Sequence, residues 1–353
     1  VGHGPLRCLF TADEEVGMHG AANLEESTIN SKYLVSLDGE QKGQLYRGCA
    51  GAITVEFSDT FGSGDVKDGL SKVTVRISGL KGGHSGREIQ NHRLSASVMT
   101  IKILDRLFES FGARVIDIKC GTVSNGITSN TEMSVAVKSS DTQAALSRIQ
   151  ETIDDFAGEY PEETIERKLD VSDIGPGDFV CRTSDTETVL KVLKELKYGV
   201  FEADGNHVTK SSNIAPISLA AGKFAASSMM RSDYNEWLLQ QMAYYLTFGD
   251  DSNVPCEITS GNPAWYCPTI YPMVEMLKNF YAEALGHDIE DYRSQGGVEP
   301  SHFCQLRPDL QVTCFGPEIN NAHTSKETLH IDDVPAVLKA TVRTLQHVNE
   351  LGE

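Results

Sequence analysis

Three features of other protein classes are missing from this 353-residue sequence. Basic residues are outnumbered, 31 against 50 acids, and the formal net charge of −19 disfavours nucleic acid or an anionic membrane as a partner, because both need a basic face. No apolar run is long enough for a membrane span, and the first residues lack the basic and apolar parts of a secretory signal. The eight cysteines include no Cys-x-x-Cys pair, which disfavours a disulfide framework or a cysteine zinc site. We therefore expect a cytoplasmic protein with no nucleic acid and no membrane as partners.

What is present indicates an ordinary globular protein, 40% hydrophobic and 23% charged, with a length that suggests two domains. Alternating strand and helix patterns in residues 1–52 and 256–353 predict an α/β domain with a mixed sheet. The segment between them, residues 53–255, has the pattern of an inserted α+β domain with an antiparallel sheet. No internal repeat is evident in the sequence. Apolar spacing predicts helices over 94–111, 144–156, 188–196, 273–284 and 334–351, and strands around 53–57, 73–77, 115–118, 133–137, 214–220, 224–230 and 312–315.

An acidic run, Thr-Ala-Asp-Glu-Glu-Val-Gly at residues 11–17, follows an apolar segment at 6–10 that we predict to be a buried strand. A helical segment at 21–25 and a second strand at 33–37 follow, and the second strand also ends at an acid, Asp38. Adjacent carboxylates repel one another, so such a cluster needs cations, protons or open solvent. A divalent metal is one solution when histidine is also available, and a solvated loop is the other.

Two histidines lie in loops that suit a functional site. His323 follows a predicted buried strand, as Asp38 does, although a loop histidine is more often a polar surface residue. His84 is surrounded by glycines in Gly-Gly-His-Ser-Gly, which lets the backbone approach another molecule closely; a tight surface turn is the alternative. This segment is not a serine-nucleophile elbow, because serine is not at the centre of the motif.

Two further polar residues end or interrupt predicted strands. Arg231 lies at the end of a strand, where its guanidinium could bind a carboxylate or form a structural ion pair. Asn125, in Gly-Thr-Val-Ser-Asn-Gly, could orient a substrate amide or cap a turn.

Several separate motifs occur here in one order over the whole chain: Thr-Ala-Asp-Glu-Glu-Val-Gly-Met-His-Gly-Ala, Leu-Asp-Gly-Glu, Gly-Cys-Ala-Gly-Ala, Gly-Gly-His-Ser-Gly-Arg-Glu-Ile and a late Gly-Pro…Ala-His-Thr. This order resembles the aminoacyl-histidine dipeptidase branch of the two-zinc exopeptidases. The resemblance implies a zinc-exopeptidase-like α/β catalytic domain interrupted by a lid domain, a homodimer formed through the lid, and hydrolysis of unblocked dipeptides, Xaa-His among them. It also implies two Zn²⁺ ions per complete subunit, which Co²⁺ or Mn²⁺ can replace.

The resemblance also implies a role for each candidate residue. Glu14 matches the general base, and Glu15, Asp38 and His323 match metal ligands. His84 matches a lid histidine that reaches the scissile carbonyl across the dimer, while Asn125, Arg231 and Glu299 match substrate-binding groups, Arg231 at the C-terminal carboxylate and Glu299 at the free α-amine.

One part of the family pattern has no counterpart in these residues. The family places a His-x-Asp element and a bridging aspartate before the acidic run, and the only His-x-Asp of this sequence, His330-Ile331-Asp332, comes near its end. We therefore expect the catalytic sheet to be incomplete, and the chain as given to bind less than two zinc ions and to turn over slowly. The alternative function is a catalytically inactive remnant that keeps only lid-mediated dimerisation. A carboxylate-rich cation-binding protein is disfavoured, because no Asp-x-Asp-x-Asp-Gly loop is present.

Overall fold

The computed structural model describes residues 2–15, 17–66, 69–322 and 326–351, and it divides into two compact units. Unit 1 comprises Val1–Gly51, Asp233–Asn235 and Gly261–Glu353, and unit 2 comprises Ala52–Ser232 and Glu236–Ser260. No helix among the described residues is both long and apolar enough to cross a membrane. The roles that we expect for these segments, catalytic and lid, remain predictions.

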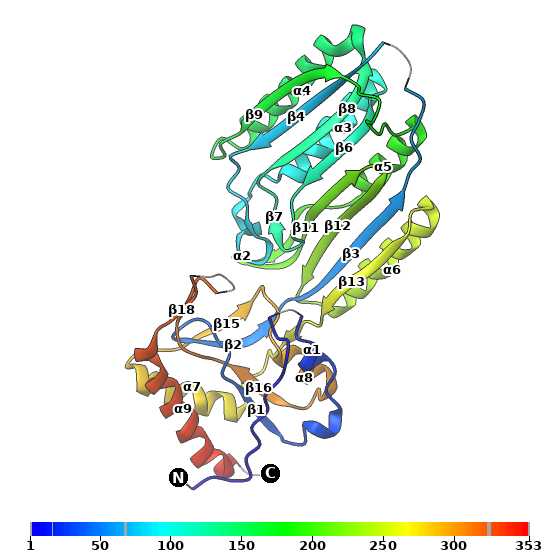
Figure 1. Cartoon of the computed structure of the whole chain (residues 1–353). Coiled ribbons are helices and arrows are strands. Elements are labelled where there is room, and N and C mark those ends of the chain that lie inside the picture. The colour runs from blue at the N-terminus through cyan, green and yellow to red at the C-terminus, as the bar shows by residue number, and fades with distance from the viewer. Residues whose placement is uncertain (1, 16, 67–68, 323–325, 352–353) are drawn as a thin grey trace. The chain divides into compact units, whose positions relative to one another are not determined.

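Unit 1 is built on a mixed five-stranded sheet (Figure 1). Its strands run in the order β1 (Tyr33–Ser36), β16 (Gln311–Cys314), β2 (Gln44–Cys49) and β14 (Trp265–Tyr266), with β15 (Glu290–Ser294) also paired to β2. β1 is parallel to β16, and β15 is parallel to β2, whereas β16 and β14 run antiparallel to β2.

Helices cover both faces of this sheet, and successive residues of one strand accordingly belong to different apolar cores. On β2, Leu45 packs with α7 (Pro272–Leu285) and α9 (Val334–His347). Its neighbour Tyr46 packs with the residues of α1 (His19–Ala22) and α8 (Pro300–Leu306). Side chains of a strand alternate between the faces, so one strand serves two cores. The expected mixed sheet with helices on both faces is confirmed in unit 1.

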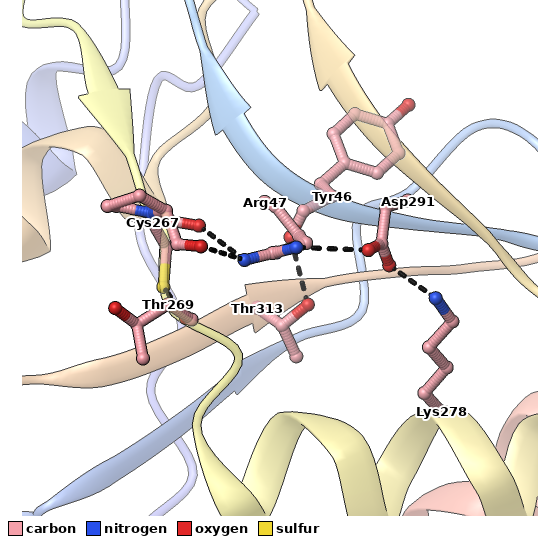
Figure 2. A network of polar contacts seen from close by, with 8 residues as sticks. Tyr46, Arg47, Cys267, Thr269, Lys278, Asp291 and Thr313 are labelled. Atoms are coloured by element: carbon pink, nitrogen blue, oxygen red, sulfur yellow. Dashed lines mark hydrogen bonds and ion pairs between the residues drawn. The ribbon is translucent and has the colours of Figure 1, made fainter.

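A polar network fastens the strands of unit 1 to one another. The guanidinium of Arg47 on β2 donates from Nη1 to Asp291 Oδ2 on β15 (3.0 Å) and from Nη2 to the carbonyl oxygen of Cys267 (2.8 Å) (Figure 2). Lys278 on α7 donates to the other oxygen of Asp291 at 2.6 Å, and Thr313 Oγ1 on β16 donates to the backbone oxygen of Tyr46 at 2.9 Å. Burial alone would raise the pKa of Asp291, but Lys278 and Arg47 hold it below its usual value.

Unit 2 contains a nine-stranded antiparallel sheet whose helices pack with it into a single core (Figure 1). The sheet order is β13-β3-β12-β11-β6-β8-β4-β9, with β10 paired to β11. The strands are β3 (Gly51–Thr60), β4 (Leu70–Ser78), β6 (Arg114–Cys120), β8 (Thr131–Lys138), β9 (Glu166–Asp173), β10 (Gly199–Asp204), β11 (His207–Ala220), β12 (Lys223–Ser232) and β13 (Cys256–Asn262). The helices are α3 (Ala96–Phe111), α4 (Thr142–Glu159), α5 (Thr183–Glu195) and α6 (Asn235–Ser252).

This sheet consists of the same topology used twice, which the sequence did not reveal. One β-α-β-β-α-β repeat is β4-α3-β6-β8-α4-β9, and it is inserted after the first strand of the other, β3-α5-β11-β12-α6-β13. In each repeat the strands lie side by side in the order fourth, first, third, second. The two repeats join where their second strands, β6 and β11, pair antiparallel. The join makes one continuous sheet from two small ones.

Most predicted elements are confirmed, and the exceptions have physical reasons. Residues 6–10 are not a strand: they pair with no strand of the described chain, and Phe10 is 92% exposed. Strands β9 and β13 were missed because they lie at sheet edges with mostly exposed residues, which removes the alternating pattern. Helix α6 was missed because Leu239 and other apolar residues on it are exposed.

Candidate active site

The ends of β1 and β16 bring two predicted site segments to one edge of the unit 1 sheet. The strands are parallel, so the residues that follow them emerge on the same side. Phe315 N donates to Ser36 O at 3.1 Å, and Ile319 N donates to Glu40 O at 2.9 Å. Asp38 therefore lies beside the loop that continues β16 and leads to His323. His323 itself lies outside the described residues.

Glycines permit this close approach of the two segments. A Cβ atom added to Gly316 would come within 2.0 Å of Gly39 O, and one added to Gly39 would come within 2.5 Å of the Phe315 carbonyl carbon. No side chain fits at either position without displacing the backbone. The neighbouring Cys314 thiol has its pKa raised to about 12, chiefly by burial and also by the charge of Asp38. Cys314 is therefore an unreactive core thiol rather than a nucleophile or a thiolate ligand.

The acidic run forms a turn rather than the end of a strand. Asp13 has φ +57°, in the left-handed region, and Glu14 O accepts hydrogen bonds from Gly17 N (3.1 Å) and Met18 N (3.0 Å). Glu14 is half-buried, whereas Asp13 and Glu15 are exposed. The turn therefore gives Glu14 less access to solvent than Asp13 and Glu15 have.

Glu299 lies on an element that packs beside this turn. It precedes α8, and the adjacent Val298 shares an apolar core with Met18, which directly follows the acidic turn. The Oε1 atom of Glu299 is buried and has no hydrogen-bond partner among the residues that the structure describes. A buried carboxylate oxygen without a hydrogen-bond partner in the protein is suited to accept a hydrogen bond from a bound ligand.

The described residues do not by themselves form a metal centre. In the ranges 2–15, 17–66, 69–322 and 326–351, no group of three or more His, Cys, Asp or Glu side chains is arranged to hold a metal ion. Glu15 and Asp38 are carboxylates of a kind that zinc accepts, but the expected third ligand, His323, is outside these ranges. The fit of a metal is therefore not shown by the described residues.

In unit 2, two predicted residues that are 41 positions apart are brought together by a short ladder. β5 (Gly83–His84) pairs antiparallel with β7 (Gly126–Ile127), and His84 is opposite Gly126. Ser85 N donates to Asn125 O at 2.8 Å. This pairing could not be predicted from the glycine-rich segment around His84 or from the one around Asn125. The predicted neighbours of the substrate, His84 and Asn125, thus belong to one local structure.

The hydrogen bonds of His84 determine which ring nitrogen carries the proton. The backbone N–H of Gly86 donates to His84 Nδ1 at 3.2 Å, while His84 caps α2 (Ser85–Glu88). An N–H group can only donate, so Nδ1 must accept, and the neutral imidazole then carries its proton on Nε2. His84 therefore presents an Nε2–H donor, the form needed to stabilise a developing oxyanion.

Arg231 is near the end of β12, as predicted, and is only 7% exposed. Its strand neighbour on β11 is Ser211. Burial lowers the pKa of Arg231 to about 10, so the guanidinium is still charged at neutral pH. A buried cation of this kind favours a ligand carboxylate, with which a guanidinium can form two parallel hydrogen bonds.

One residue of this region was not anticipated from the sequence. Asn213 on β11 donates from Nδ2 to the backbone oxygens of Ser124 and Gly126, on both sides of Asn125. The only signal in the sequence was a polar run, Ser-Ser-Asn, at the start of an otherwise apolar strand segment.

The sequence and the fold of the chain are similar to those of known peptidases. Residues 1–347 match the model of peptidase family M20/M25/M40. The chain is 23% identical over 335 residues to the cytosol non-specific dipeptidase of Escherichia coli, covering 94% of this chain and 69% of that protein. Its fold is similar to the crystal structure of aminoacylhistidine dipeptidase from Vibrio alginolyticus, with a TM-score of 0.83 and 22% identity over 97% of this chain and 70% of that one.

These matches confirm the expected fold class and the expected family. The family is one of metal-dependent peptidases, so the protein is a hydrolase. The chain belongs to peptidase family M20/M25/M40.

Proposed function

We propose that this peptidase hydrolyses unblocked dipeptides, including those with C-terminal histidine. The observation that carries the proposal is Arg231, a charged and buried guanidinium in the unit that also holds His84 and Asn125. A free C-terminal carboxylate is the substrate group that such a cation recognises, and it distinguishes a dipeptide from an internal peptide bond. The names of the Escherichia coli and Vibrio alginolyticus relatives support this substrate class.

The chemistry that we propose divides among a few side chains of this chain. Glu14 takes a proton from the attacking water and passes it to the leaving amine, the work of a general base and acid. His84 donates from Nε2 to the oxygen of the scissile carbonyl, and Asn125 orients the substrate amide. Arg231 binds the C-terminal carboxylate. Glu299 binds the free α-amine, for which its buried Oε1 is suited.

Glu15, Asp38 and His323 are the residues that we propose as ligands of zinc, with Co²⁺ or Mn²⁺ as substitutes. Bound zinc would polarise the scissile carbonyl and lower the pKa of water. The positions of Asp38 and of the loop that leads to His323, at the same edge of the sheet, support their part of this set. We also propose a homodimer formed through unit 2, in which His84 completes the site of the partner.

A panel of substrates tests the proposal with the full-length protein. Ala-His and Ala-Ala should be cleaved, whereas N-acetyl-Ala-His and Ala-His amide, each with one terminus blocked, should be cleaved at least about 100-fold less efficiently, because each loses a charged contact. Liberated amino acid is measured by chromatography. Equal cleavage of the amide and the free dipeptide would disprove the role of Arg231, and failure to cleave any free dipeptide would disprove the function.

A further inference from the structure

Asn213 is a buried polar residue whose contacts lead directly to the predicted catalytic groups. Its side chain lies on β11 and is 1% exposed. Nδ2 donates to Ser124 O at 2.8 Å and to Gly126 O at 2.9 Å. The two acceptors immediately precede and follow Asn125, so one amide group fixes the backbone on both sides of it.

The orientation of this amide follows from the chemistry of its neighbours. Backbone carbonyl oxygens only accept hydrogen bonds, so the atom that faces both of them must be the NH₂ group. The Oδ1 atom is consequently left buried, with no hydrogen-bond partner among the described residues. An unsatisfied buried acceptor costs free energy. A serine or leucine on β11 would avoid that cost but could not bridge the two carbonyls.

The constraint continues from Asn125 to His84. Gly126, one of the two acceptors, is the register partner of His84, and Ser85 N donates to Asn125 O. β5 and β7 have only two residues each, so this ladder has little stability of its own. The 14-residue strand β11, paired with β12 on one side and with β10 and β6 on the other, supplies the fixed reference that the short ladder lacks.

We propose that Asn213 is a positioning residue of the active site, which holds the Asn125 loop and, through the β5–β7 pairing, sets the direction of the His84 Nε2–H donor. It touches neither substrate nor metal. The proposal rests on the proposed function of His84 and Asn125. In it, β11 keeps the segments that carry these two residues in register.

Substitution of Asn213 in the full-length protein tests this. Asn213→Asp keeps the shape of the side chain but replaces both donors by an oxygen, and Asn213→Ala removes the amide without introducing a buried charge. Each should lower kcat/KM for Ala-His about 10- to 100-fold, mainly through kcat, because the loss of two buried hydrogen bonds misplaces a group that acts in the transition state. Hydrogen exchange of the amides in residues 83–89 and 122–128 should become about tenfold faster or more.

Asn130→Ala is the matched control, since Asn130 is an exposed asparagine near the same segment, and among the residues that the structure describes its amide donates only to Ser129 Oγ. It should leave both readouts unchanged. Asn213→Ala should also add little to the loss in a chain that already carries His84→Ala and Asn125→Ala, because it acts through them.

The outcomes separate this inference from the function on which it rests. Faster hydrogen exchange together with a non-additive loss of kcat supports the role of Asn213 as a positioning residue. Wild-type exchange in folded Asn213→Ala, or a loss that multiplies with those of His84→Ala and Asn125→Ala, overturns it. If wild-type protein cleaves no dipeptide, the proposed function fails, whereas hydrogen exchange still decides whether Asn213 holds the two segments. If Asn213→Asp does not fold, the same comparison is made with Asn213→Ala.

Discussion

Replacing Arg231 by methionine should make the protein more stable and less active at the same time. The pKa of Arg231 is lowered to about 10 by burial, a change from the ordinary value that corresponds to about 3 kcal/mol of disfavoured charge. Methionine has a similar length and no charge, so it fills the same space without the cost of taking a charge out of water, which is several kcal/mol per buried ion. We expect a gain of about 1 to 3 kcal/mol in the free energy of unfolding.

The pH dependence of this gain has a definite sign. The folded-state pKa lies below the unfolded one, so the cost of the charge is fully present at any pH below about 10. As the pH rises above 10 the guanidinium loses its proton in the folded state and the cost declines. The advantage of Arg231→Met over wild type should therefore be constant from pH 6 to 9 and shrink above pH 10.

Activity should move in the opposite direction. Loss of a charge-assisted contact to the C-terminal carboxylate should lower kcat/KM for Ala-His at least about 100-fold and leave the cleavage of Ala-His amide almost unchanged. Urea unfolding, followed by tryptophan fluorescence, and chromatographic assays of both substrates measure the two effects. Arg114→Met is the control: Arg114 donates to the backbone oxygens of Cys181 and Asp65, so its loss should destabilise unit 2 without changing the ratio of the two substrates. An unchanged ratio in Arg231→Met would refute carboxylate recognition, and a clear loss of stability would refute the cost that we assign to its burial.

Three further changes have definite expected results. Glu14→Gln should lower kcat about 10²- to 10⁴-fold with little change in KM, because it removes the group that moves the proton and keeps the shape; an unaltered kcat would exclude Glu14 as the base. Mixing His84→Ala subunits with Glu14→Ala subunits should restore activity to about one competent site per mixed dimer, because each mutant supplies what the other lacks; verified heterodimers that stay inactive would contradict the role of His84 across the dimer. Asp291→Asn should lower the free energy of unfolding by about 1 to 2 kcal/mol at pH 7, since it removes the charged acceptor of Arg47 and Lys278 at a partly exposed site. The pKa of Asp291 is lowered, so this difference, measured by urea unfolding, should be full above the unfolded pKa of about 4, decline as the pH falls below it, and be lost once the pH is also below the folded-state pKa; a difference that does not decline in this range would contradict the assignment.

The sequence predicted those elements in which the spacing of apolar residues matches the pattern of buried positions. Helix α3 was foreseen from apolar residues at helical spacing, and seven of its residues are buried, among them Leu104 and Leu107. Strand β8 was foreseen in the same way from its run of apolar residues. Edge strands such as β9 carry no such signal, and an apolar segment such as residues 6–10 gives a false one, because pairing depends on which neighbour is present.

In the candidate site, too, the sequence indicated individual residues but not the contacts between them. The acidic turn, the glycine-flanked histidine and the strand-end arginine each stood out, because their residue types are unusual in those local patterns. The relations among them did not, since the pairing of His84 with Gly126 and the reach of Asn213 to both sides of Asn125 depend on tertiary structure. The repeated topology of unit 2 was hidden for a related reason: the two repeats share an order of strands, while one is inserted into the other.

The central claim is that the full-length protein is a metal-dependent dipeptidase, and its most direct test is the hydrolysis of Ala-His before and after removal of metal. Histidine release should stop after exhaustive chelation and dialysis, and it should return when Zn²⁺ is added back, and also with Co²⁺ or Mn²⁺. Full activity in the chelated protein, with metal analysis showing that none remains, would contradict the account.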